Sequence, residues 1–188
     1  MRQIDPNPRN PTLRAGATAP MLLAALLAFA LVLGCGTGPT ATPTAPGYPA
    51  DGSSPASADP EVVSFVQQMN AHRQSLGLEP LLWYPGVAAV ATAHSQDMID
   101  RGFFSHTNPD GESPWDRLQA AGISYSAAGE NIAYGYGTGS SVLSAWLGSP
   151  GHKANIEHAA FTHHGVGKAG TYWTHVFLVP TTSSAARK

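Results

Sequence analysis

The sequence predicts an α+β domain in which helices outnumber strands and the sheet is small and antiparallel. Helix-start signals recur along the chain, each with a proline at the first helical position and a capping residue before it. After residue 160 the pattern changes to alternation with a period of two, which is typical of strands. Because the chain contains neither internal repeats nor a βαβ alternation, solenoids and parallel α/β folds are excluded.

Residues 1–34 have the composition of a bacterial secretory signal. A basic start is followed by an uncharged apolar run at 15–34, and Cys35, the only cysteine, comes directly afterwards. The local sequence VLGCG is similar to a lipobox, whose cysteine is lipidated and becomes the mature N-terminus. An uncleaved transmembrane anchor is the alternative, because the run is just long enough to span a bilayer. Both interpretations place the rest of the chain outside the cytoplasm, and the first anchors it to a bacterial membrane through lipid on Cys35.

Residues 35–58 combine the cysteine with a tether rich in Pro, Thr, Ser and Gly that has almost no large apolar side chains. A domain follows at 59–182, and 183–188 form a short tail. With one cysteine in the chain, the domain has no internal disulfide, so its stability must come from core packing. The 10 Lys and Arg nearly balance the 12 Asp and Glu without a basic block, which argues against a nucleic-acid partner.

The first two helices of the domain follow from capping residues and helical spacing. Asp59, Pro60 and Glu61 predict a helix start, and Gly77 a stop. A second helix is expected from Pro85 to the glycine at 102. The apolar stripes are Val62, Val66, Met69 and Leu76 on the first helix, and Val87, Val90, Ala91, His94 and Met98 on the second.

Three shorter helices and a hairpin complete the expected elements. Ser113 caps a third helix, a fourth covers 141–148, and Ser149 with a following proline starts a fifth. The residues from 163 to 179 predict a β-hairpin around a Lys-Ala-Gly turn, with Trp173, His175, Phe177 and Val179 on one face. The segment GENIAYG at 129–135 is expected to add a short strand.

Most of the eight histidines have a simple interpretation. His94 lies on the apolar face of its helix and is expected to be a hydrogen-bonded core residue, whereas His72 is expected to be solvated. His158 is expected to be peripheral. His163 and His164 are adjacent on a strand and point to opposite faces, so these last three histidines are treated as incidental.

Three residues remain as a candidate site. His106 follows an aromatic pair in a loop, Glu130 lies in GENIAYG, and His152 lies in the first turn of the fifth helix, where the dipole favours a neutral imidazole. Two imidazoles and a carboxylate could bind Zn²⁺ or another divalent cation with one position open. Alternatively, His106 and Glu130 hydrogen-bond across two loops and have a structural role only.

The segments HTNPDGESPWDRLQAAGISYSAAGENIAYG, AWLGSPGHKANI, GVG and YWTHVF resemble the CAP superfamily. This superfamily includes the cysteine-rich secretory proteins, insect venom antigen 5 and the group-one pathogenesis-related proteins, and the segment SPGH is similar to that of exported bacterial members. The likeness covers residues 60–179. It implies an α-β-α three-layer sandwich with a cleft on one side.

The resemblance also implies which residues line that cleft. In animal and plant members it holds two His and two Glu, of which His106 and Glu130 match one each. The second Glu position corresponds to Ser149 and the second His position to Tyr172, with His152 partly filling the gap. His175 stands where the family commonly has Gln. These departures from the pattern weaken an activity based on the four residues.

Three functions are consistent with these residues. The first is an extracytoplasmic binding or scaffold module, because the resemblance implies that the cleft takes divalent metals, lipids, sterols or protein partners. The second is a metal-assisted hydrolase acting on peptide or cell-wall polymer, with His106 or His152 as base and Glu130 as its orienter or a general acid. The third is a purely structural envelope protein. We expect the binding module.

Overall fold

A computed structural model describes residues 3–5 and 59–181. The signal segment other than 3–5, Cys35, the tether and the tail lie outside the described residues. The elements in chain order are β1 Gln3–Asp5, α1 Pro60–Ser75, β2 Leu82–Trp83, α2 Pro85–Asp100, α3 Pro114–Ala120, β3 Tyr125–Tyr134, α4 Gly139–Leu147, α5 Pro150–Ile156, β4 His163–Ala169 and β5 Tyr172–Pro180. Within the described ranges, no helix has both the length and the apolar character that crossing a bilayer requires.

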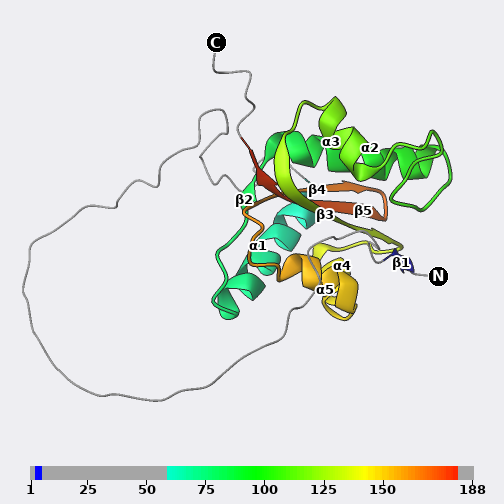
Figure 1. Ribbon diagram of the computed structural model, residues 1–188. Coiled ribbons are helices and arrows are strands. Elements are labelled where there is room, and N and C mark those ends of the chain that lie inside the picture. The colour runs from blue at the N-terminus through cyan, green and yellow to red at the C-terminus, as the bar shows by residue number, and fades with distance from the viewer. Residues whose placement is uncertain (1–2, 6–58, 182–188) are drawn as a thin grey trace, which may run out of the picture.

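The expected α-β-α three-layer sandwich is confirmed. Figure 1 shows α2 and α3 on one face of the sheet and α1, α4 and α5 on the other. The strand order is β1-β3-β5-β4-β2. The predicted hairpin is formed by β4 and β5, and β3 pairs antiparallel with β5. One pair differs from the prediction: the two-residue strand β2 runs parallel to β4, so the sheet is mixed.

The predicted helix starts are found with their caps in place. Asp59 Oδ1 accepts a hydrogen bond of 2.8 Å from the Glu61 backbone N–H. Ser113 and Asp116 form a reciprocal capping box on α3. The predicted stop at Gly77 is confirmed, because the helix ends at Ser75 and Gly77 has a positive φ of 73°. The prediction that Leu76 belongs to the apolar stripe was wrong, because Leu76 is 50% exposed and lies beyond the last helical residue. The buried face of α1 instead ends with Arg73.

The helix α2 lies directly on the hairpin because β4 has two glycines beneath it. A Cβ atom at Gly165 would overlap the backbone of Ala88, and one at Gly167 would overlap the backbone of Thr92. The small apolar cluster of this layer contains Val87, Ala91, Leu118, Ile123, Val176 and Leu178. Removing both side chains from the strand therefore lets the helix and sheet backbones approach closely.

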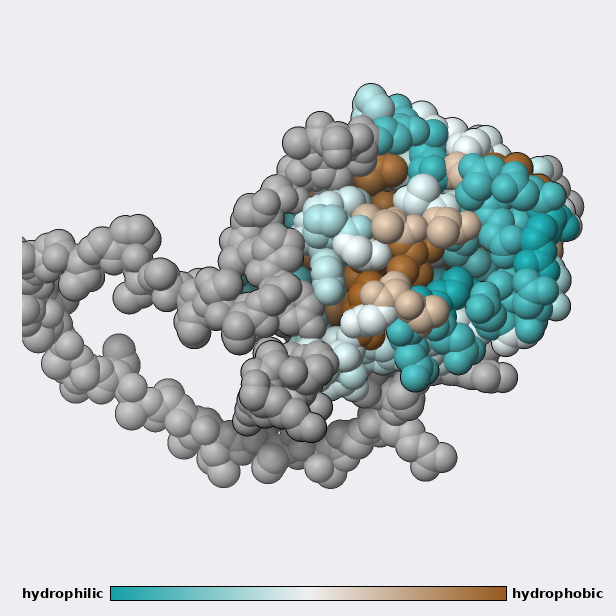
Figure 2. All heavy atoms as spheres, turned by 90° about the horizontal axis from the view of Figure 1, so that it is seen from above, coloured by the Kyte–Doolittle hydropathy of each residue, from teal (hydrophilic) through white to brown (hydrophobic). Residues whose placement is uncertain are grey.

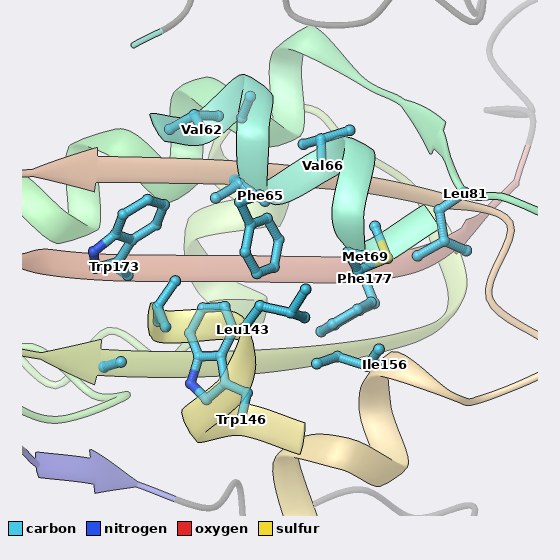
Figure 3. Close-up of a cluster of buried hydrophobic side chains, with 14 of the residues drawn as sticks. Val62, Phe65, Val66, Met69, Leu81, Leu143, Trp146, Ile156, Trp173 and Phe177 are labelled. Carbon is cyan, nitrogen blue, oxygen red and sulfur yellow. The ribbon is translucent and has the colours of Figure 1, made fainter. Parts of the chain in front are cut away.

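The larger core lies on the opposite face, between the sheet and the helices α1, α4 and α5. Figure 3 shows Phe65 of α1 facing Trp146 of α4 and Trp173 of β5. The Phe65 and Trp146 rings meet edge to face with centroids 5.4 Å apart. Arg73 is buried at the same layer and donates to the backbone carbonyls of Glu79, Ile156 and His158. It thereby joins the end of α1 to the end of α5.

Candidate functional site

Glu130 is the centre of a buried ionic network on the α2 and α3 face of the sheet. Its side chain is 1% exposed, and Oε1 accepts a hydrogen bond of 2.7 Å from Nδ1 of His106. Oε2 accepts a second bond of 2.9 Å from Nη2 of Arg117 on α3. Arg117 also donates through Nη1 to the backbone carbonyls of His106 and Glu112. One carboxylate therefore holds the loop before α3, and α3 itself, against β3.

Protonation in this network follows from burial and from the partners. Burial raises the pKa of the Glu130 carboxyl, but the hydrogen bond from His106 and the charge of Arg117 outweigh it and hold that pKa below its ordinary value. Burial lowers the pKa of His94, so this ring is neutral at pH 7. Nε2 of His94 lies 3.0 Å from the Ser105 carbonyl, which can only accept. Nε2 therefore carries the proton, and Nδ1 presents a lone pair.

The neighbouring Asn131 points to the opposite face and connects β3 to α5. Asn155 Nδ2 donates to Asn131 Oδ1 at 2.8 Å, and Asn131 Nδ2 donates to the His152 carbonyl at 3.1 Å. A Cβ atom on Gly129 would lie 3.1 Å from Asn155 Oδ1, which leaves little room for any side chain there. The three residues of the GEN segment thus have separate roles. Gly129 lets Asn155 approach the strand closely, Glu130 is the centre of the ionic network, and Asn131 pairs with the Asn155 amide.

The structure does not bring His152 together with His106 and Glu130. The His152 ring stacks beside Trp146 at 6.3 Å, and its Nδ1 lies 2.8 Å from Ser149 Oγ. Both contacts belong to the α4 and α5 layer, so the sheet separates this ring from the other two residues. Throughout the described ranges, 3–5 and 59–181, no three His, Cys, Asp or Glu side chains are placed to hold a metal. One divalent-cation site shared by these three residues stays a prediction, which their positions in two layers do not support.

The other residues implied by the resemblance also fail to form one cleft. Tyr172 is half-buried on the α2 face, where its ring lies 4.3 Å from that of Tyr134. His175 is fully buried on the opposite face, with Nε2 3.0 Å from Nδ1 of His164. His164 is therefore not incidental, contrary to the expectation from sequence.

His72 also has a partner that the sequence did not predict. Its Nε2 lies 2.8 Å from Glu157 Oε1, so it forms a contact between α1 and the end of α5 rather than being solvated.

A groove lies between α2 and α3, with a volume of about 370 Å³. We call it the α2–α3 groove. It is lined by Val90, Ala93, His94, Asp97 and Arg101 from α2 and its end, by Asn108, Asp110 and Glu112 from the following loop, and by Arg117 and Ala120 from α3. Figure 2 views the face of the molecule that carries these helices, where hydrophilic surface borders a smaller apolar area. Arg117 belongs to both the groove wall and the Glu130 network.

Sequence reasoning missed Arg117, although a signal was present. A buried carboxylate requires a cationic partner, and Arg117 is the only Lys or Arg between residues 103 and 128. Reasoning from sequence also missed the His164 and His175 pair. The strand alternation predicted the face on which each ring lies, but it did not show that pairing of the two neighbouring strands puts the rings side by side.

Comparison with protein-family models identifies the family of this chain. The cysteine-rich secretory protein family (CAP) model matches residues 66–179, which is more than half of the chain. The chain belongs to the CAP family. The family resemblance of the GEN and SPGH segments is thereby confirmed, and in this CAP domain those segments meet through Asn131 and Asn155.

Two curated relatives come from Bacillus subtilis (strain 168). YkwD, an uncharacterized protein, is 43% identical over 128 residues, which cover 67% of this chain and 50% of YkwD. YlbC, an uncharacterized membrane protein, is 38% identical over 109 residues, which cover 58% of this chain and 32% of YlbC. This CAP chain thus spans half or less of the relatives that it matches.

Two solved structures have the same fold. An extracellular protein with an SCP domain from Bacillus anthracis str. Ames matches with a TM-score of 0.60 and 36% identity, covering 62% of this chain and 39% of that one. An outer surface protein from Borrelia burgdorferi matches with a TM-score of 0.61 and 21% identity, covering 64% of this chain and 93% of that one. The second likeness concerns the CAP fold alone.

Proposed function

We propose that this CAP domain is an extracytoplasmic binding module and that the α2–α3 groove is its binding surface. The proposal rests on Arg117, which belongs both to the Glu130 network and to the groove wall. Its guanidinium is fixed by Glu130 at 2.9 Å, and the same side chain forms part of the groove wall. A wall held by a buried ion pair is preorganised, which lowers the entropic cost of binding.

The size and openness of the groove support the same function. Its volume of about 370 Å³ falls in the lower part of the range of ~300–1,000 Å³ that is typical of ligand sites. It combines small apolar side chains with polar groups, as binding sites commonly do. None of His106, Glu130 and His152 lines the groove, so its proposed ligand is separate from a divalent cation on those residues.

The proposed location is the bacterial cell envelope, with the chain anchored by lipid on Cys35. The signal-like segment 1–34 and the VLGCG sequence support this location. The related structures are described as an extracellular protein and an outer surface protein. Mass spectrometry of the mature protein should find a diacyl modification on Cys35, and a peptide that starts at Met1 would contradict the anchor.

A substitution that fills the groove tests the binding function. We expect small polar and charged fragments added to residues 59–188 to shift backbone NMR signals of α2, the following loop and α3. Ala93→Trp places a large ring in the groove from an exposed position and should abolish these shifts. Gln96→Trp, exposed on the same helix but outside the groove, is the matched control. Shifts that persist in Ala93→Trp would contradict the proposal.

A hydrolase is the second candidate, and one observation favours it. Nδ1 of His106 donates to Glu130 at 2.7 Å, which orients the imidazole as a carboxylate orients a general base. However, Glu130 is also bound to Arg117, and Ser113 Oγ is bound to its capping partner Asp116. Turnover of a peptide or peptidoglycan substrate that disappears in Glu130→Gln would establish the enzyme over the binding module.

A further inference from the structure

We propose that the α2–α3 groove takes the side chain of a lysine or arginine residue from a partner polypeptide. The inference rests on the proposed function, because it names the ligand class of the same groove. It is argued from the charges of the groove, from its apolar surface and from a buried acceptor in its wall.

The charges on the groove favour a cationic ligand. Asp97, Asp110 and Glu112 line it, and the carboxylate of Glu130 lies behind Arg117. Two arginines face these four carboxylates. Arg101 pairs with Asp97 at 3.6 Å and with Asp110, while Arg117 is bound to Glu130. The groove therefore has an excess of negative charge.

Glu112 is the carboxylate best placed to receive a ligand. It is exposed, and its Oε2 accepts a hydrogen bond of 2.8 Å from the amide of Asn108, which carries no charge. Asn108 Oδ1 in turn accepts from the Asp110 and Glu112 backbone N–H groups at 3.1 and 2.9 Å. The loop is thus fixed by the Asn108 amide, and no Lys or Arg among the described residues forms an ion pair with Glu112.

The apolar part of the groove matches the stem of such a side chain. Val90 is half-buried, and Ala93 and Ala120 are exposed, so small apolar surfaces of α2 and α3 face the same space. Lysine and arginine carry three or four methylene groups before the charged group and commonly lay them along apolar surface. A small cation without a stem would leave this surface uncovered.

A buried acceptor in the wall adds to the same preference. His94 is 1% exposed, and its Nδ1 has no hydrogen-bond partner among the described residues. Because Nε2 carries the proton, the Nδ1 lone pair directs negative potential into its surroundings. Burial keeps this ring uncharged, so it does not oppose the approach of a cation.

The shape of the groove fits a side chain that belongs to a longer polypeptide. The groove is open rather than enclosed, so a side chain can enter it while the rest of its chain stays outside.

Calorimetric titration with matched peptides tests the proposal. The probes are Ac-Gly-Ala-Lys-Ala-Gly-NH2 and its arginine, norleucine and glutamate variants, added to residues 59–188. We expect the lysine and arginine peptides to bind at least about tenfold more tightly than norleucine. Raising the salt concentration from about 50 to about 300 mM should weaken them, because the added contact is between charges.

Charge-removing variants locate the contact. Glu112→Gln should weaken the lysine peptide about threefold, and its combination with Asp97→Asn about tenfold, with the norleucine peptide unchanged. Glu79→Gln removes an exposed carboxylate far from the groove and is the matched control. Equal affinity of lysine and norleucine peptides, or an equal effect of Glu79→Gln, would overturn the proposal.

The outcomes separate this inference from the proposed function. If other fragments bind and Ala93→Trp blocks them, but the lysine peptide does not bind, the binding module stands and the basic ligand is wrong. If spermidine binds as tightly as the lysine peptide and Glu112→Gln weakens both equally, the groove takes free amines and the polypeptide partner is wrong.

Discussion

At the scale of single residues, Glu130 shows how one buried charge can organise three segments. Its two oxygens accept from His106 and Arg117, and Arg117 also donates to the His106 backbone carbonyl. A buried charge is costly unless it is paired and hydrogen-bonded, and here both oxygens have partners. The sequence supplied Glu130 and His106 as candidates, and the structure adds the cation that makes the burial of Glu130 possible.

Replacing Glu130 by glutamine tests this role. The amide keeps the shape but leaves the guanidinium of Arg117 without its counter-charge, so we expect the free energy of unfolding to fall by about 3 kcal/mol. Urea denaturation followed by circular dichroism measures the change. The exposed Glu79→Gln should change stability by less than about 0.5 kcal/mol. A comparable loss in both variants would contradict a specific role for Glu130.

The buried pair of His164 and His175 makes stability depend on pH. Burial lowers the pKa of His164 to about 3 and that of His175 well below its ordinary value, so both rings are neutral in the folded chain. In the unfolded chain they bind protons below about pH 6.5. The free energy of unfolding should therefore fall as the pH decreases from about 6.5 toward 3, by up to about 1.4 kcal/mol per pH unit for each ring.

His175→Gln tests this dependence. Glutamine does not titrate, and the CAP resemblance places a Gln commonly at this position. We expect the slope of the free energy of unfolding against pH, between about pH 6 and 4, to become shallower by up to about 1.4 kcal/mol per pH unit, the contribution of one proton. His94 and Glu130 still contribute acid sensitivity. Chemical denaturation at several pH values measures the slope. An unchanged slope in His175→Gln would refute the prediction.

At the scale of elements, the contact of α2 with β4 depends on the absence of two side chains. The stripe on α2 could be predicted from spacing, but Gly165 and Gly167 gave no sign in the sequence that a helix would lie on them. Their role is visible only where Ala88 and Thr92 occupy the space of a missing Cβ. A local sequence pattern does not indicate how closely the backbones of a helix and a strand approach each other.

Gly167→Ala should therefore destabilise the domain. The added methyl group would force α2 away from the hairpin, and overpacking of this kind costs about 1–3 kcal/mol. Gly137→Ala is the control, because a Cβ there meets no atom within 4 Å. Thermal unfolding should show a lower midpoint for Gly167→Ala and a nearly unchanged one for Gly137→Ala. Equal midpoints for the two variants would show that α2 can adapt.

At the scale of the whole molecule, the fold was more predictable than the site. Helix starts depend on short segments such as Ser113 to Asp116, and strand alternation is equally local, so both could be identified from sequence. The layer in which each polar side chain lies depends on pairing between distant strands. That is why His152 was grouped with Glu130, although the sheet separates them, and why Arg117 and the groove were missed.

The domain should fold without a disulfide, because the only cysteine of the chain precedes it. Residues 59–182 are expected to unfold in one cooperative transition, with a van't Hoff enthalpy equal to the calorimetric enthalpy. Differential scanning calorimetry measures both enthalpies. Two separate transitions, or a van't Hoff enthalpy well below the calorimetric one, would contradict a single cooperative unit.

The opposite directions of Glu130 and Asn131 have a consequence for how this family can vary. A deletion or insertion of one residue in the middle of β3 would exchange the two side chains, placing the carboxylate among apolar rings and the amide beside Arg117. The irregular pairing between Tyr125 and Ala127 offers a place where a length change can be absorbed. In related sequences, we therefore expect alignment gaps around residue 126 and in the loop at 135–138, and none between 128 and 133.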